Sequence, residues 1–216
     1  MVDWIISEEP VELPHAIAEM ERRSTAIANG VENEAVWLLE HPHLFTLGTS
    51  GIEDHIVQPT TLPVHRVGRG GQVTYHGPGQ RIAYLMLNLN DRRRDVRNFV
   101  RSIEKWIILT LSEFGIEGET RDNRVGIWVQ RPDDREDKIA AIGIRLRRWV
   151  SLHGVSINVD PDLRHYASIV PCGIREHGVT SMTKLGKPAT MGELDRMLKK
   201  KFNLAFGPDS VAKGID

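Results

Sequence analysis

The chain contains a single cysteine, Cys172, which stands between a proline and a glycine in the stretch SIVPCGI. A lone cysteine is often a small buried hydrophobe, but Pro171 and Gly173 favour a rigid, exposed turn that a substrate can reach. The thiolate is the nucleophilic form, and an ordinary thiol is mostly protonated near neutral pH. Cys172 is therefore a candidate nucleophile that needs a neighbouring group to lower its pKa.

Two residues are candidates for that group, and the residue types alone leave both open. Lys138 begins the apolar run KIAAIGIR, where partial burial would lower the pKa of its amine and allow it to carry protons. The alternative is a lysine at a strand edge that reaches into solvent. His76, in TYHGPGQ, has the ordinary pKa of a base that works near neutral pH, and cysteine–histidine pairs are common.

The stretch GRGGQVTYHGPGQ, residues 68–80, contains five glycines. Glycine loses more conformational freedom on folding than any other residue, so such a cluster needs a reason. Tight turns are one reason, and a carbonyl or phosphate group held close to the backbone is another. The stretch lacks the lysine and hydroxyl spacing of a P-loop, which makes a phosphate loop a weak interpretation. Small residues that would let an acyl chain or its carbonyl lie against backbone N–H groups are Gly70, Gly71, Ala141, Gly143 and Gly154.

Other polar features give weaker signals. His41 and His43 in HPH have no clear third partner, so we expect no metal site. The basic runs DRRRDVRNFVR and RLRR are typical of a solvated face, but they could also dock an acidic protein.

Composition indicates a globular protein that is large enough to bury a core. The chain has 216 residues, of which 40% are hydrophobic and 26% charged, and a formal net charge of -1. We therefore expect no nucleic acid or membrane partner. One cysteine cannot form an internal disulfide, no signal peptide is visible, and no apolar stretch approaches the roughly 20 residues that span a bilayer. These observations predict a cytoplasmic protein.

Helices and strands are mixed along the chain without strict alternation. Apolar spacing and capping residues predict helices over 13–28, 95–114 and 190–202, and apolar runs predict strands over 35–40, 81–89, 125–130, 138–146 and 149–159. No linker is long enough to divide the chain. The sequence thus predicts one α/β or α+β domain over residues 1–216, with a mixed, largely antiparallel sheet, flanking helices and a weakly structured tail over about 207–216.

Four stretches, RGGQVTYHGPGQ, KIAAIGIR, HGVSINV and IVPCGI, resemble the lipoyl(octanoyl) transferases in order and spacing. The match runs from EHPHLFTLG to VPCGIREHGVTSM, over residues 40–182. It implies the fold of the biotin and lipoate protein ligases, which is related to class II synthetases. It also implies an octanoyltransferase of lipoate biosynthesis that uses neither a cofactor nor a metal.

The resemblance also implies a role for each matching residue. Cys172 takes an octanoyl group from octanoyl-acyl carrier protein as a thioester, and Lys138 lowers the pKa of the thiol and serves as acid and base. The acceptor is a lysine ε-amine on lipoyl domains of 2-oxoacid dehydrogenase complexes or on the glycine cleavage H protein. The implied acyl-substrate contacts are Arg69, Gly70, Gly71, Gln72, Val73, Thr74, Tyr75, His76, Ala141, Ile142, Gly143, Gly154, Val155 and Ser156.

Two alternatives stay open. One is an ATP-dependent lipoate or biotin ligase of the same fold, although PCGI and the lack of a clear adenylate-binding motif weigh against it. The other is a non-catalytic module that binds carrier proteins, which a reactive thiol of low pKa at Cys172 would exclude. For the octanoyltransferase, we expect at least one arginine cluster (Arg92, Arg93, Arg94 and Arg97, or Arg145, Arg147 and Arg148) to guide the docking of an acidic carrier protein.

Overall fold

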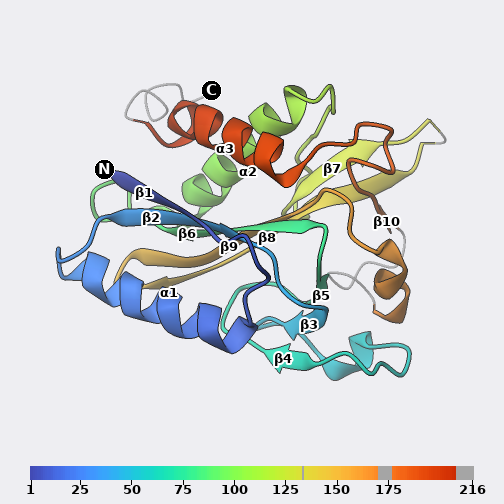
Figure 1. Ribbon diagram of the computed structural model, residues 1–216, viewed down its shortest axis with the longest axis horizontal. Helices are drawn as coiled ribbons and strands as arrows, with labels where there is room; N and C mark the ends of the chain where they lie inside the picture. Colours follow the sequence, from blue (N-terminus) through green and yellow to red (C-terminus); the bar gives the residue numbers. More distant parts are fainter. Residues whose placement is uncertain (133, 170–176, 208–216) are drawn as a thin grey trace.

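A computed structural model describes residues 1–132, 134–169 and 177–207, and its main sheet is mixed and largely antiparallel (Figure 1). Within these residues, seven strands form this sheet in the order β1-β2-β6-β9-β8-β10, with β7 paired to β8. Only β1–β2 and β8–β10 are parallel pairs in it. The strands are β1 (Val2–Ile6), β2 (Glu34–Leu39), β6 (Gln80–Met86), β7 (Ile127–Gln130), β8 (Glu136–Arg147), β9 (Val150–Asn158) and β10 (Gly178–Val179).

A smaller sheet lies beside the main one and holds part of the glycine-rich stretch. Its order is β4-β3-β5, with β3 (Leu44–Leu47), β4 (Val64–Arg66) and β5 (Val73–His76). The residues between β4 and β5 form a loop, here called the glycine loop (residues 67–72). The chain then turns through Gly77 and Gly79 directly into β6. The glycine-rich stretch thereby connects the two sheets.

Helices cover both faces of the main sheet. In Figure 1, α1 (Leu13–Ala28) lies against one face, and α2 (Val96–Ser112) and α3 (Met191–Phe206) lie against the other. The alternation of β6 divides the core accordingly, because successive side chains of a strand point to opposite faces. Ala83 and Leu85 pack in the cluster with α2 and α3, whereas Ile82 and Tyr84 pack in the cluster with α1.

Local sequence signals predicted most of these elements. The helix expected over 13–28 is α1, and α3 begins with the expected capping box of Thr190 and Glu193. The predicted strands correspond to β2, β6, β7, β8 and β9, with ends shifted by a few residues. The prediction of a mixed, largely antiparallel sheet with flanking helices is confirmed. The sequence analysis missed the strands β1, β3, β4, β5 and β10.

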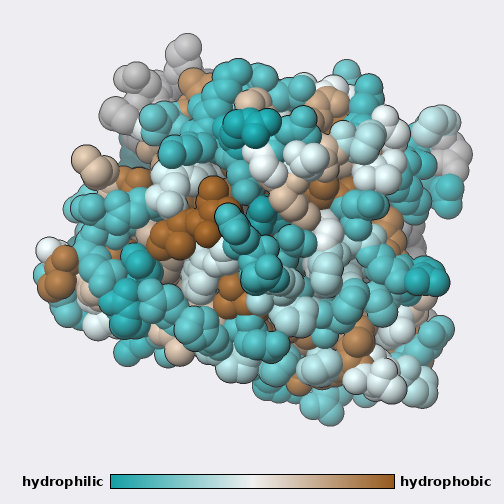
Figure 2. Space-filling view, viewed as in Figure 1, coloured by the Kyte–Doolittle hydropathy of each residue, from teal (hydrophilic) through white to brown (hydrophobic). Residues whose placement is uncertain are grey.

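The surface drawn in Figure 2 is mostly hydrophilic, with separate apolar areas. Exposed apolar side chains such as Ile6 and Val31 lie far apart in the sequence. Among the described residues, no helix combines the length and apolarity needed to cross a membrane.

A buried ion pair fastens α3 to the main sheet. Arg81 of β6 donates from Nη2 to Asp195 Oδ2 of α3 at 3.0 Å, and both side chains are almost fully buried. Burial raises the pKa of the Asp195 carboxyl, although the arginine beside it opposes this shift. Removal of one partner from a buried pair leaves the other charge without compensation in a poorly solvated place.

We therefore expect Asp195→Ala to lower the free energy of unfolding by about 3–5 kcal/mol. Urea unfolding at neutral pH measures this loss. The double variant Arg81→Leu/Asp195→Leu is the matched control, because it removes both charges and should recover much of the stability. A loss below about 1 kcal/mol in Asp195→Ala would contradict a fastening role for the pair.

Candidate active site

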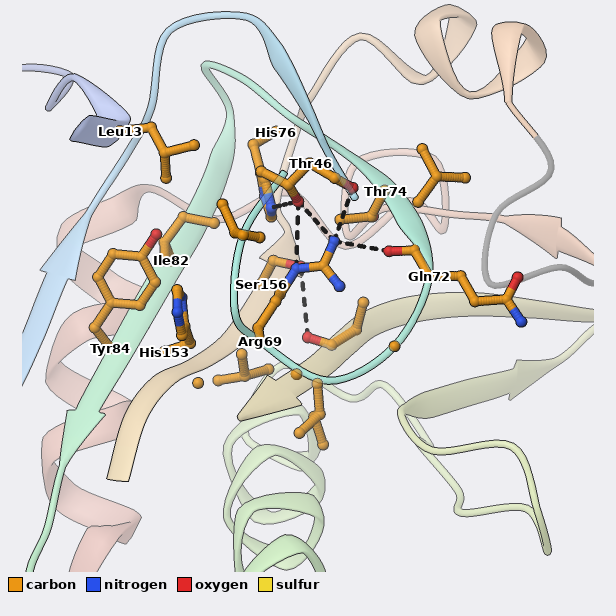
Figure 3. A pocket seen from close by; sticks show the side chains of 18 residues that line it. Leu13, Thr46, Arg69, Gln72, Thr74, His76, Ile82, Tyr84, His153 and Ser156 are labelled. Atoms are coloured by element: carbon orange, nitrogen blue, oxygen red, sulfur yellow. Dashed lines mark hydrogen bonds between the residues drawn. The ribbon is translucent and has the colours of Figure 1, made fainter. Parts of the chain in front are cut away.

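A pocket opens between the glycine loop and the strands β6, β8 and β9 (Figure 3). Its empty space, together with the open solvent at its mouth, amounts to about 580 Å³. Most residues to which the resemblance assigns substrate contacts line it: Arg69, Gly71, Gln72, Val73, Thr74, His76, Ala141, Ile142, Gly143, Gly154, Val155 and Ser156. The structure therefore brings three distant segments of the sequence together around one cavity.

Gly70 and Tyr75 do not line this pocket. Gly70 donates its N–H to Ile144 O at 2.9 Å, which presses the glycine loop against β8. Tyr75 is fully buried beside Phe45, and its hydroxyl hydrogen-bonds His43 Nδ1 at 2.6 Å. Their contribution is to hold the wall in place from behind.

The glycine cluster serves close backbone approach. A Cβ atom added to Gly143 would lie 2.9 Å from Gly70 O and 3.0 Å from Arg69 Cδ, closer than real Cβ atoms pack. Gly71 has φ +86°, a conformation that side-chain-bearing residues rarely adopt. The glycines thus allow the loop to run directly over β8 and close one side of the pocket.

The guanidinium of Arg69 fixes the shape of the glycine loop. It donates to the backbone oxygens of Thr46, Gly70 and Gln72 at 2.9 Å each, and to Thr46 Oγ1 at 2.6 Å. The bonds to Thr46 join the loop to β3, and the bonds to Thr46 and Gln72 are drawn as dashed lines in Figure 3. Arg69 consequently brings a fixed positive charge to the pocket wall.

Lys138 lines a second, smaller cavity that adjoins the pocket. The two cavities share the wall residues Thr74, Ala141 and Ser156, so they lie next to each other. The smaller cavity is completed by Asn158, Tyr166 and Val179. The end of the pocket at Thr74, Ala141 and Ser156, here called the lysine end, is therefore the end nearest to Lys138.

Lys138 is buried, so the alternative of a strand-edge lysine in solvent is wrong. Its side chain is 8% exposed, its Nζ donates to Val125 O at 3.2 Å, and it lies 4.6 Å from the centroid of the Trp128 ring. An aromatic face attracts an ammonium group, and this attraction strengthens away from water. The ε-amine is thus held in a defined place at the lysine end.

Cys172 lies outside the described residues, in the segment 170–176. The described residues that flank this segment lie near the site. Ile169 packs in the cluster that contains Tyr75, and the ring of His177 lies 5.3 Å from the ring of Trp128, which Lys138 also contacts.

His76 is buried, neutral and hydrogen-bonded at both ring nitrogens. Nδ1 donates to Gln80 Oε1 at 2.7 Å, and Nε2 accepts from Thr46 Oγ1 at 3.2 Å. Burial, together with His41 and Arg69 nearby, lowers the pKa of His76 to about 3. A histidine that is this hard to protonate is poorly suited to be the base of the site, which favours Lys138.

His41 and His43 do not converge on a common point. His41 donates from Nδ1 to Val11 O at 2.5 Å and accepts from the Tyr84 hydroxyl at 2.7 Å, whereas His43 pairs with Tyr75. In the part of the chain that the structure describes, no group of three or more histidine, cysteine or acidic residues could hold a metal ion.

The two arginine clusters of the sequence approach each other at Arg94 and Arg148, whereas Arg145 lies beside Gly68 of the glycine loop and pairs with Glu21. Arg94 lies over the Trp149 ring at 5.6 Å, and Asn90 Nδ2 donates to Arg148 O at 3.4 Å. About 30 Å of extended strand separate Lys138 from Arg147 at the far end of β8. A docking role for this surface stays a prediction, and it would act at a distance from Lys138.

The sequence analysis missed several residues of the pocket wall: Leu13, Thr46, Val67, Ile82, Tyr84 and His153. Ile82 and Tyr84 could have been found, because their alternation in β6 puts them on one face. Leu13 comes from α1, far away in the sequence, and no local pattern links it to the site.

Solved structures with the same fold define the class of the protein. The chain superimposes on lipoate-protein ligase A bound with ATP with a TM-score of 0.69, at 14% identity over 94% of this chain and 85% of the other. It matches a bi-partite archaeal lipoate protein ligase from Thermoplasma acidophilum equally well, with a TM-score of 0.69 at 15% identity over 95% and 84% of the two chains. The fold is that of the lipoate protein ligases, as the resemblance implied.

Sequence comparison identifies the family within this fold. Residues 14–203 match the lipoyl protein ligase A/B catalytic domain. The chain is 57% identical to an octanoyltransferase of Jannaschia sp. (strain CCS1) over 96% of this chain and 100% of the relative. It is 56% identical to an octanoyltransferase of Rhodopseudomonas palustris (strain HaA2) over 100% of this chain and 86% of the relative. The protein belongs to this family and is an acyltransferase of the octanoyltransferase group.

Three buried histidines around the pocket predict a strong dependence of stability on pH. Burial is the main cause that lowers the pKa from 6.5 to about 4 in His41, about 3 in His76 and about 4 in His153. Below pH 6.5 the unfolded chain binds protons that the folded protein rejects, so stability is complete above this pH and falls as the pH drops toward 4. Each of the three histidines should lower the free energy of unfolding by about 2 kcal/mol between pH 7 and pH 5.

Urea unfolding over this pH range measures the effect. His76→Gln removes one of the three buried histidines, so the free energy of unfolding should fall less steeply as the pH drops. His15→Gln changes an exposed position and should leave that dependence as it is. If the free energy of unfolding stays constant from pH 7 to pH 5, the conclusion that these three histidines are buried in their neutral form is wrong.

Proposed function

We infer that the protein transfers an octanoyl group from octanoyl-acyl carrier protein to the lysine ε-amine of lipoyl domains, through a thioester on Cys172. The observation that carries this proposal is the position of Lys138, buried in a small cavity that adjoins one end of a pocket with a mainly apolar wall. The pocket suits an acyl chain, and the lysine end suits the reacting carbonyl.

The wall of the pocket supports an alkyl ligand. Leu13, Val67, Val73 and Ile82 contribute apolar surface to it. Burial of one methylene group is worth about 0.8 kcal/mol, so an octanoyl chain can gain several kcal/mol from such a wall. Gly71 and Gln72 of the glycine loop line the pocket, and their backbone N–H groups are the proposed donors to a carbonyl oxygen.

The proposed reaction has two acyl transfers. In the first, the Cys172 thiolate attacks the carbonyl carbon of the carrier thioester, and the carrier thiolate leaves and takes a proton from the ammonium group of Lys138, which becomes neutral. In the second, the acceptor amine attacks the enzyme thioester, loses a proton to Lys138, and the Cys172 thiolate leaves as the amide forms. The ammonium form of Lys138 favours the thiolate in the first step, and its neutral form accepts the proton in the second.

Thioester exchange is nearly balanced in free energy and the final amide is more stable, so the reaction needs no nucleotide. The naming of close relatives as octanoyltransferases favours this reaction over an ATP-dependent ligase of the same fold. A lipoyl domain as acceptor is supported by the archaeal lipoate protein ligase of this fold, which is described together with its E2 lipoyl domain. Lipoyl domains of 2-oxoacid dehydrogenase complexes and the glycine cleavage H protein are the proposed acceptors.

Cys172→Ala should abolish transfer, because the thioester cannot form without the thiol. Incubation with an octanoyl thioester and no acceptor should leave one octanoyl group on the wild-type protein and none on Cys172→Ala, as read by intact mass. The chain has no other cysteine, so the adduct is assigned without ambiguity. Near-normal transfer by a folded Cys172→Ala protein would remove the covalent mechanism.

Lys138, rather than His76, should set the pKa of the thiol. The rate of iodoacetamide labelling at Cys172 as a function of pH reports this pKa. Lys138→Ala should move the profile to higher pH, because a cation near the thiolate is lost, and His76→Ala, as the matched control, should leave the profile near that of the wild type. The reverse pattern would assign the activating role to His76.

A further inference from the structure

His153 has an unusual backbone conformation in the middle of β9. Its φ is +60°, although its neighbours continue the pairing with β8 on both sides. Its N–H donates to the sulfur of Met20 in α1 at 3.4 Å. A positive φ is uncommon for a residue with a bulky side chain and costs free energy, and such strain clusters at functional sites.

This conformation brings the side chain of His153 to the pocket. In a regular strand, neighbours point to opposite faces, and Val155 packs in the cluster with α2 and α3, on the face away from α1. His153 nevertheless lines the pocket together with Gly154 and Ser156. Figure 3 shows the His153 ring beside Tyr84, on the side of the pocket where Leu13 and Ile82 also lie and away from Thr74 and Gln72.

The ring of His153 brings hydrogen-bonding atoms to an otherwise apolar end of the pocket. Among the described residues, neither ring nitrogen has a hydrogen-bond partner, and the Tyr84 hydroxyl is taken by His41. Burial, with Arg69 and Arg145 nearby, lowers the pKa of His153 to about 4. The ring is therefore neutral near neutral pH and carries one donor and one acceptor.

The distance from the lysine end matches the length of an acyl chain. Ser156 belongs to the lysine end, and His153 lies about 10 Å away along β9. An extended octanoyl chain whose carbonyl lies at the lysine end would place its methyl group close to the ring.

We propose that His153 sets the upper limit on acyl-chain length in the transfer reaction, as a polar stop at the far end of the pocket. This proposal rests on the function inferred above. A chain that ends before the ring leaves its nitrogens to water, whereas a longer chain covers them with methylene groups and leaves a buried polar group unpaired. The polarity of the ring, and not only its volume, then opposes longer chains.

The test compares octanoyl and decanoyl thioesters as donors for the wild type, His153→Gly and His153→Asn. Glycine and asparagine both accept a positive φ, so either variant can keep the fold of β9. In His153→Gly, the decanoyl-to-octanoyl ratio of kcat/KM should rise by about 5- to 100-fold, the range that follows from an unpaired buried polar group. It should rise less in His153→Asn, which keeps a polar group. An unchanged ratio in the variants, with octanoyl transfer retained, overturns the proposal.

Two controls separate polarity from size and from general loosening. A decanoyl chain that ends in a hydroxyl group can hydrogen-bond the ring, so the wild type should transfer it faster than decanoyl, and His153→Gly should not. No advantage in the wild type overturns the polar basis. Val73→Ala, a truncation near the lysine end, should change the transfer of octanoyl and decanoyl groups alike. If it shifts the decanoyl-to-octanoyl ratio of kcat/KM as much as His153→Gly does, the proposal is overturned.

Binding of free octanoate and decanoate, measured by calorimetry, keeps the two inferences distinguishable. If the wild type transfers no acyl group, the proposed function fails, and the affinity ratio of the two acids still tests His153. The ratio should shift toward decanoate in His153→Gly, and an unchanged affinity ratio overturns the proposal.

Discussion

The close approach of the glycine loop to β8 is the constraint on which the site depends. Gly70 N–H bonds to Ile144 O, and Gly143 leaves no room for a Cβ atom between the two backbones. A larger residue at Gly143 would lift the loop from the strand and with it Arg69, whose guanidinium ties the loop to β3. The smaller sheet and the main sheet would then lose the contact that makes the pocket.

A second constraint is the satisfaction of polar groups behind the wall. His76 donates to Gln80, Gln80 donates from Nε2 to Asn158 Oδ1 at 2.9 Å, and Asn158 donates to Thr180 O at 2.9 Å. This chain starts at the pocket and reaches the strand edge beside Lys138, since Thr180 N–H in turn bonds to Lys138 O. Buried amides that satisfy one another in this way leave few alternative rotamers, so they fix the relative position of the pocket and the lysine.

The sequence predicted those parts of the fold that depend on local patterns. Capping residues, helical spacing and long apolar runs are short-range signals, and α1, α3, β8 and β9 follow from them. The strands β3 and β5 could not be predicted in this way, because β5 is embedded among glycines and gains its extended form from pairing with β3. The parallel edge strand β1 depends on β2, which follows only after α1.

The same distinction applies to the site. The resemblance indicated which segments face the substrate, and most of them do meet around one cavity. It could not indicate that Lys138 is sheltered by Trp128 or that β9 bends its backbone at His153, because both depend on contacts between elements far apart in the chain.

The electrostatic character of the pocket therefore differs between its two ends. The lysine end holds a buried amine beside an aromatic ring and a backbone carbonyl, where a proton can be moved in either direction. The far end holds His153, whose low pKa keeps the ring neutral near neutral pH, so the ring can hydrogen-bond without carrying a charge. An acyl chain bound as proposed would be oriented without any charged group on its tail, because the buried amine of Lys138 lies at one end of the pocket and the ring of His153 at the other.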